Sequence, residues 1–198
     1  MRPRNFGVRV HNQEKATQGF TLFSPLWDQK TSLINMAGDV VHEWELPGTP
    51  GGYARLLPNG NLFYATTTEE GPPFKGGAGG GLIREVDWDN NVVMEYRDDW
   101  QHHDLRRLPN GNILYAGWEM MPEDAAKRVK GGIPGTELPE GIVNDFVKEV
   151  TPAGEIVWEW HAHSDMDIEK YELHPLCPRR VFAWFNTTFA LENGDVLI

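Results

Sequence analysis

The sequence predicts an all-β protein, a β-propeller built of four-stranded antiparallel blades, with about half of the ring present in this chain. Three observations predict it. Asn-Gly pairs at 59–60, 110–111 and 193–194 each separate two strand-like runs, and Asn-Gly is a strong hairpin signal. A second element, at 37–46, 89–98 and 153–162, indicates a turn followed by an alternating strand. The two elements alternate at about 50 residues, as in propeller blades.

The elements follow in chain order. Residues 1–18 form an irregular N-terminal arm, and residues 19–198 form the partial propeller. Its blade parts are expected at 20–46, 52–97, 101–161 and 183–198, with an insertion at 119–141. The Asn-Gly pairs predict type I′ turns, in which both central residues have positive φ. A β-sandwich with similar hairpins is the alternative fold.

The insertion and two other segments allow local predictions. "PEDAAKRV" indicates one or two helical turns with Pro122 at the start. The insertion is either a lid or specificity loop, or a surface excursion. "KGGAGGG" at 75–81 indicates a flexible link, since no helix follows it to form a phosphate loop. His42 lies mid-strand and is expected to pack between blades.

Composition limits the classes of function. The 198 residues are 40% hydrophobic and include eight tryptophans, which indicates a globular core. A net charge of −11 argues against nucleic acid as a partner. The N-terminus lacks the apolar stretch of a signal peptide, and no run is long enough to cross a membrane. Cys177 is the single cysteine, so no internal disulfide forms and a cytoplasmic location is expected.

Histidines gather at two predicted junctions between an outer strand and the next inner strand. "WQHHD" contains His102, His103 and Asp104, and "WHAHSD" contains His161 and His163. These five residues are the catalytic candidates, because imidazole suits proton transfer or covalent attack near neutral pH. We expect His103 and at least one of His161 and His163 to face one cavity. Asp104 or Asp165 is expected to orient an imidazole there.

No cofactor is predicted, although a metal stays open. "HHD" and "HxH" both supply ligands, but neither has a diagnostic spacing. Successive strand residues point to opposite faces, so His102 and His103 are not expected to chelate one ion. A metal-dependent hydrolase or lyase using the histidine cluster is therefore kept as an alternative.

Four segments carry a resemblance to a known family. "GFTLFSP…TSLINMAGDVVHEWELP", "HHDLRRLPNGNILYAGW", "VKEVTPAGEIVWEWHAHSDMD" and "FNTTFALENGDVLI" resemble the arylsulfotransferase-like propeller family over about residues 19–198. The resemblance implies a longer, roughly six-bladed propeller. It implies transfer of a sulfuryl group from a phenolic ester to a phenol through a channel histidine, with nearby His and Arg residues holding the sulfate oxygens.

Carried onto this sequence, the resemblance matches His102 or His103 to a family histidine. The substrate-binding candidates are Arg106, Asn186, Trp118 and Trp184, the last of which stands where many relatives have a histidine. The expected partner is a small aromatic molecule. A non-catalytic propeller that binds or scaffolds is the alternative function.

Half of a ring would expose two apolar blade faces. We therefore expect that a second polypeptide, or a C-terminal remainder of a longer chain, completes the propeller. These 198 residues are accordingly not expected to be a self-sufficient monomer.

Overall fold

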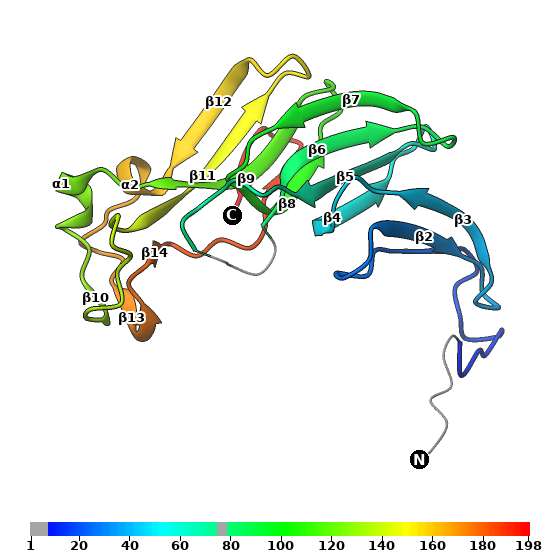
Figure 1. Ribbon diagram of the computed structural model, residues 1–198, viewed down its shortest axis with the longest axis horizontal. Helices are drawn as coiled ribbons and strands as arrows, with labels where there is room; N and C mark the ends of the chain where they lie inside the picture. The colour runs from blue at the N-terminus through cyan, green and yellow to red at the C-terminus, as the bar shows by residue number, and fades with distance from the viewer. Residues whose placement is uncertain (1–7, 75–78) are drawn as a thin grey trace.

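The computed structural model describes residues 8–74 and 79–198, and antiparallel β-sheets dominate it (Figure 1). The first sheet has the order β1-β2-β3, with β1 at Thr21–Phe23, β2 at Lys30–Ile34 and β3 at Val40–Glu45. The second has the order β4-β5-β6-β7, with β4 at Pro50–Leu56, β5 at Leu62–Thr67, β6 at Gly81–Val86 and β7 at Val92–Arg97. The all-β prediction is confirmed.

The third sheet has the order β12-β11-β9-β8 and carries the predicted histidines. Its strands are β8 at Gln101–Arg107, β9 at Ile113–Met120, β11 at Val143–Val150 and β12 at Ile156–His161. β12 pairs with β11 only from Phe146 onward. The short β14 at Val181–Phe182 pairs in parallel with the start of β11 instead, at Val143 and Asn144. The chain after β14 is thereby held beside the start of β11.

The Asn-Gly hairpins differ from the predicted type I′ turns. In each, the glycine N–H donates to the carbonyl three residues back, as Gly60 does to Leu57 and Gly111 to Leu108. Gly60 and Gly111 have φ of +88° and +86°, whereas the asparagines before them are not among the described residues with positive φ. This pattern is a type I turn followed by a left-handed residue, the three-residue hairpin loop with a bulge. Asn90, with φ +66°, takes the glycine's place in the β6–β7 turn.

Neighbouring sheets meet through their first strands and through their turns. β1 contacts β4, and β4 contacts β8, so the three sheets follow one another side by side (Figure 1). At the junction of the first two sheets, the Trp44 indole N–H donates to the Asp87 carbonyl at 3.1 Å. His42 stacks on Trp88 with ring centroids 3.9 Å apart. His42 therefore packs between two sheets, as the sequence predicted.

The main core fills the space between the second and third sheets. Its fully buried members come from both, and include Phe63 and Ile83 from one sheet and Leu105 and Tyr115 from the other. Burial of such side chains stabilises the folded chain by about 1.5–3 kcal/mol each. This core fixes β8 and β9, the strands that hold the first group of candidate site residues.

The insertion between β9 and β11 belongs to a smaller, separate core. β9 extends to Met120, so the insertion starts later than the predicted residue 119. It contains α1 at Glu123–Ala126, preceded by Pro122 as predicted, and β10 at Gly131–Ile133, which pairs in parallel with β13 at Leu173–Pro178. Apolar residues of the insertion pack against residues after β12, including Ala162 of α2, a single turn at Ala162–Asp165. The insertion is therefore packed against the body of the protein.

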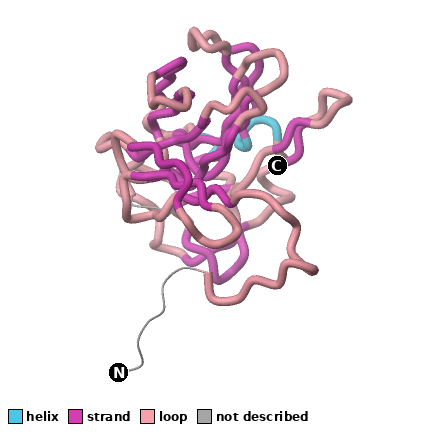
Figure 2. The backbone as a smooth tube through the Cα atoms, turned by 90° about the vertical axis from the view of Figure 1, so that its right-hand side faces the viewer, coloured by secondary structure: helices cyan, strands magenta, loops and turns pink. Residues whose placement is uncertain are grey.

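The C-terminal part forms a hairpin, β15 at Phe189–Ala190 and β16 at Val196–Leu197, which projects beside the C-terminus (Figure 2). Residues 1–7 of the expected N-terminal arm, and residues 75–78 of the expected glycine-rich link, lie outside the described residues. Within residues 8–74 and 79–198, no helix is long and apolar enough to cross a lipid bilayer.

Candidate functional site

The start of β8 is irregular, and this irregularity builds the site. Gln101 pairs with Gly117 and Leu105 pairs with Tyr115, so three residues of β8 lie opposite one residue of β9. His103 sits at the centre of this bulge with φ +50°, a left-handed conformation uncommon outside glycine. The Nδ1 atoms of His102 and His103 lie 2.9 Å apart. The expectation that the two imidazoles point to opposite faces was wrong, because it assumed a regular strand.

His102 is held by Trp118 and Asp145 as well as by its contact with His103. It is fully buried, and its ring stacks on Trp118 with centroids 4.0 Å apart. Its Nε2 lies 3.0 Å from Oδ1 of Asp145, which is fully buried on β11. The alignment of this contact falls outside strict hydrogen-bond angles, and neither atom has another hydrogen-bond partner within the described chain. Because buried polar atoms need partners, we interpret the contact as the interaction that satisfies both.

The contacts of the two imidazoles fit one consistent placement of their protons. If Asp145 accepts from His102 Nε2–H, then His102 Nδ1 carries a lone pair and accepts from His103 Nδ1–H. The lone pair of His103 then lies on Nε2, for which the described chain offers no hydrogen-bond partner. Burial, with a smaller contribution from His102, lowers the pKa of His103 below its ordinary 6.5. The lowered pKa favours the neutral form of His103 at pH 7, and in this assignment its lone pair lies on Nε2.

The segment that follows β14 donates a hydrogen bond to the buried carboxyl of Asp145. The backbone N–H of Trp184 donates to Asp145 Oδ2 at 2.8 Å. Burial nevertheless raises the pKa of Asp145, although its contact with His102 opposes the rise. Ala183 and Trp184 have φ of +81° and +61°. Such strained backbone in residues other than glycine gathers at functional sites, and here it aims the Trp184 N–H at the carboxylate.

Asp104 and Arg106 hold the segment that follows β14. Asp104 does not orient an imidazole: it accepts from Thr187 Oγ1 at 2.5 Å, from Thr188 N–H at 3.0 Å and from Arg106 at 2.9 Å. Arg106 also donates to the Thr188 carbonyl at 3.2 Å and to the Tyr53 hydroxyl at 3.2 Å. The pair fastens the segment after β14 to the second and third sheets. Substrate binding by Arg106 stays a prediction.

The remaining predicted binding residues differ in accessibility. Trp118 is 4% exposed and is covered by His102 on one face, so it serves as a wall of the site. Trp184 is 38% exposed, and Asn186 is exposed two residues further on. Of these three side chains, Trp184 and Asn186 are the ones that solvent reaches most readily.

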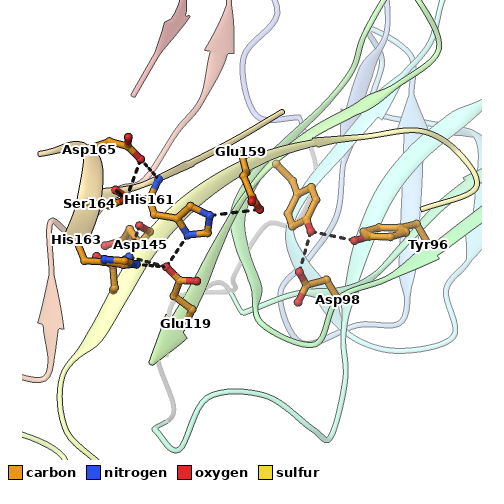
Figure 3. A network of polar contacts seen from close by, with 11 residues as sticks. Tyr96, Asp98, Glu119, Asp145, Glu159, His161, His163, Ser164 and Asp165 are labelled. Carbon is orange, nitrogen blue, oxygen red and sulfur yellow. Dashed lines mark hydrogen bonds and ion pairs between the residues drawn. The ribbon is translucent and has the colours of Figure 1, made fainter. Parts of the chain in front are cut away.

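A second group forms where β9, β12 and α2 meet (Figure 3). Glu119 Oε1 lies 2.7 Å from His161 Nδ1 and 3.5 Å from His163 Nε2. Asp165 accepts the backbone N–H of His161 at 2.8 Å, so it fixes the turn rather than an imidazole. Glu159 lies 3.3 Å from the other ring nitrogen of His161.

The two groups lie at one end of the third sheet but do not form one cavity. β8 and β12 are its opposite edges. Trp118 pairs with Asp145, and Glu119 pairs with Asn144. Since successive strand residues face opposite ways, the His102 group and the Glu119 group lie on opposite faces of β9 and β11. The single shared cavity expected for His103 and His161 or His163 is therefore replaced by two separate groups.

A cavity of about 630 Å³ adjoins the first group. Trp118 is the site residue that lines it, together with Phe74, Trp27 and backbone of Gly79 and Gly80. Gly79 also forms an isolated β-bridge with His102. The indole of Trp118 therefore lies between the cavity and the histidine pair.

Sequence reasoning missed the two carboxylates that organise these groups. Asp145 lies in the buried strand "VNDFV", where two adjacent polar residues interrupt an apolar run. That interruption was a usable signal, because a buried polar residue requires a partner. Glu119 was assigned to the insertion, and its position opposite Asn144 follows only from strand register.

Comparisons with known proteins give little beyond this geometry. No protein-family model matches the chain, and no curated protein does. Among solved structures, the chain is similar to a Bacteroides caccae protein described as of unknown function, with 17% identity and a TM-score of 0.45. The match covers 80% of this chain and 50% of that one, so this chain spans about half the length of the matched structure.

Proposed function

We propose that the chain is part of a β-propeller enzyme that transfers a sulfuryl group from a phenolic sulfate to a phenol, with His103 as nucleophile. The propeller proposal rests on the repeated antiparallel sheets and on the contacts of their first strands, β1 with β4 and β4 with β8. In a propeller such strands surround the axis, where ligands bind. The resemblance to the arylsulfotransferase-like family supplies the substrate class.

One observation carries the catalytic part of the proposal: the chain of contacts from Asp145 through His102 to His103. The buried Asp145 carboxylate fixes the tautomer of His102. His102 in turn fixes the tautomer of His103. The outer imidazole is then neutral, and its lone pair lies on Nε2, which has no hydrogen-bond partner among the described residues. This is the arrangement that nucleophile activation requires, with an inner group orienting the reacting one.

The reaction has two balanced steps. The lone pair of His103 Nε2 attacks sulfur, an N–S bond forms, and the S–O bond to the aryl group breaks, releasing phenolate that takes a proton from solvent. The acceptor oxygen then attacks sulfur, the S–N bond breaks with its electrons returning to Nε2, and the acceptor proton passes to solvent. The positive charge that His103 carries between the steps is stabilised through His102 by Asp145.

The alternative is a propeller that binds a ligand without catalysis. One observation favours it: the guanidinium of Arg106 is bound by Asp104, Tyr53 and Thr188, so it is already engaged where a sulfate would need a free cation. Under this alternative the imidazole chain stabilises the bulge of β8 and nothing more.

The test measures nitrophenol release from a nitrophenyl sulfate with phenol as acceptor. We expect turnover by the wild type, and a loss of at least about a thousandfold in His103→Ala. Asp145→Asn should lose about 10²- to 10⁴-fold, because the amide no longer enforces the tautomer. His174→Ala is the control, since His174 is exposed on β13 and, among the described residues, only accepts a local hydrogen bond from the Leu176 backbone N–H.

Two results would overturn the proposal. Unchanged turnover in His103→Ala would remove the nucleophile assignment. A wild type that binds the phenolic sulfate without turning it over would favour the non-catalytic propeller.

A further inference from the structure

We propose that Glu119, His161 and His163 form a binding site for a divalent transition-metal ion of the Zn²⁺ type, separate from the His102–His103 pair. Each residue offers one ligand atom, and the three atoms all lie within 4.8 Å of one another. The proposal goes beyond the transfer reaction, because it uses the opposite face of β9 and β11 and none of the residues to which the proposed transfer gives a role.

The distances suit the ion. With metal–ligand bonds of about 2.0–2.1 Å, ligand atoms in a tetrahedral site lie about 3.3 Å apart. Glu119 Oε1 and His163 Nε2 are 3.5 Å apart, close to that separation. Glu119 Oε1 and His161 Nδ1 are 2.7 Å apart and hydrogen-bonded. Binding would replace this proton by the ion and open that pair by about 0.6 Å.

The surroundings supply partners for the ligands. Metal-bound histidines usually donate their other ring N–H to a carboxylate, which fixes ring orientation and ligand basicity. Glu159 Oε2 lies 3.3 Å from His161 Nε2, the nitrogen that would not bind the ion. Asn144 Nδ2 donates to Glu119 Oε1 at 2.8 Å and to the Asp145 carbonyl at 2.9 Å, so it positions the carboxylate.

The backbone also holds the ligands in place. Glu119 lies on the long strand β9, paired with Asn144. His161 ends β12, and His163 follows within the single turn of α2, which the Asp165 carboxylate fixes through the His161 N–H. The short His-x-His spacing therefore spans a strand-to-turn corner, where both imidazoles approach Glu119.

Charge and exposure agree with a cation that keeps water ligands. Glu119 and Glu159 bring two carboxylates to two histidines, and the chain as a whole carries a net charge of −11. The three ligand side chains are between 19% and 27% exposed, so solvent reaches the site. Two imidazoles and one carboxylate leave a coordination position for water, the ligand count of catalytic zinc sites. Imidazole ligands favour Zn²⁺ over Mg²⁺ or Ca²⁺, which prefer oxygen.

The test is metal binding by the chelator-stripped full chain, measured by equilibrium dialysis and by titration with Zn²⁺. We expect one Zn²⁺ per chain and a higher Tm with Zn²⁺ than without. Glu119→Gln and His163→Ala should each weaken Zn²⁺ binding by more than about a hundredfold, and Glu159→Gln by about 10- to 100-fold. Mg²⁺ should not compete.

Two controls keep the result specific. His103→Ala should bind Zn²⁺ like the wild type, which separates this site from the proposed nucleophile. His11→Ala, which removes an exposed histidine before β1, should also bind normally. Circular dichroism must show native strand content in each variant, and Co²⁺ bound to the wild type should give visible d–d absorption that Glu119→Gln lacks.

The proposal is overturned if the wild type binds less than one Zn²⁺, if Glu119→Gln and His163→Ala bind as tightly as the wild type, or if Mg²⁺ binds equally well.

Discussion

His103 is distinguished from the other described histidines by its left-handed backbone. That conformation costs about 1–3 kcal/mol in a residue other than glycine, so the surrounding structure must enforce it. Here the enforcement comes from the bulge of β8 and from the imidazole of His102, which stacks on Trp118 and reaches Asp145. The same arrangement lowers the pKa of His103, because burial disfavours its charged form.

The lowered pKa of His103 predicts how stability depends on pH. Its folded pKa lies below the unfolded 6.5, so the unfolded chain binds the extra proton first as the pH falls. The stability contribution of neutral His103 is therefore complete above pH 6.5 and is lost between 6.5 and the folded pKa. Asp145 has the opposite effect on stability. Because its pKa is raised on folding, its contribution to stability is present below pH 3.8 and is lost as the pH rises through the folded pKa.

The measurement is the free energy of unfolding by urea from about pH 7.5 to 5.0, for the wild type and for His103→Gln. The wild type should lose more stability than the variant over this range, since Asp145 is common to both. Parallel curves would show that His103 titrates normally.

At the scale of elements, β9 and β11 carry the His102 group on one face and the Glu119 group on the other. The alternation of Trp118 with Glu119, and of Asn144 with Asp145, separates the imidazole pair from the proposed metal site by one layer of backbone. The ring of Phe146 on β11 packs directly over Gly117, its partner on β9. A Cβ at Gly117 would overlap that ring.

We therefore predict that Gly117→Ala destabilises the protein by about 1–3 kcal/mol, the usual cost of overpacking a core. Urea unfolding measures it. Gly60→Ala would be strained by its positive φ, so Gly79→Ala is the matched control: an added Cβ there meets nothing within 4 Å among the described residues, and its effect should stay within about 0.5 kcal/mol. A Gly117→Ala protein as stable as the wild type would mean that the Phe146 ring moves aside freely.

At the scale of the whole molecule, the last strand of each of the three larger sheets exposes adjacent apolar residues. Val40 and Val41 on β3, Val92 and Val93 on β7, and Ile156 and Val157 on β12 are each between 44% and 57% exposed. The C-terminal hairpin exposes Phe189 and Leu197. Apolar surface of this extent favours contact with further protein.

We accordingly predict that the 198 residues alone do not behave as a monodisperse monomer. Analytical ultracentrifugation should give a mass above the 22.5 kDa of one chain, or concentration-dependent association. If a second polypeptide completes the proposed propeller, co-expression with it should remove this association. A stable particle of 22.5 kDa would contradict the expectation that another polypeptide segment completes this fold.

The sequence by itself determined the all-β class and the positions of the turns. Those features depend on neighbouring residues: a glycine or Asn90 supplies positive φ, and hydrogen bonds within five residues close each turn. Even the turn type had a local signal, because Pro58 and Pro109 suit the first central position of a type I turn.

Only the tertiary structure decided which histidines act together. His102 meets Asp145, and His161 and His163 meet Glu119, across about 40 residues of sequence. These contacts depend on the register of the paired strands and on one bulge. A register shift of one residue moves the side chains of a strand to the opposite face of the sheet. Residue types and spacing alone do not predict which histidine lies beside which carboxylate. The pairing of β9 with β11, and the burial around these strands, determine it.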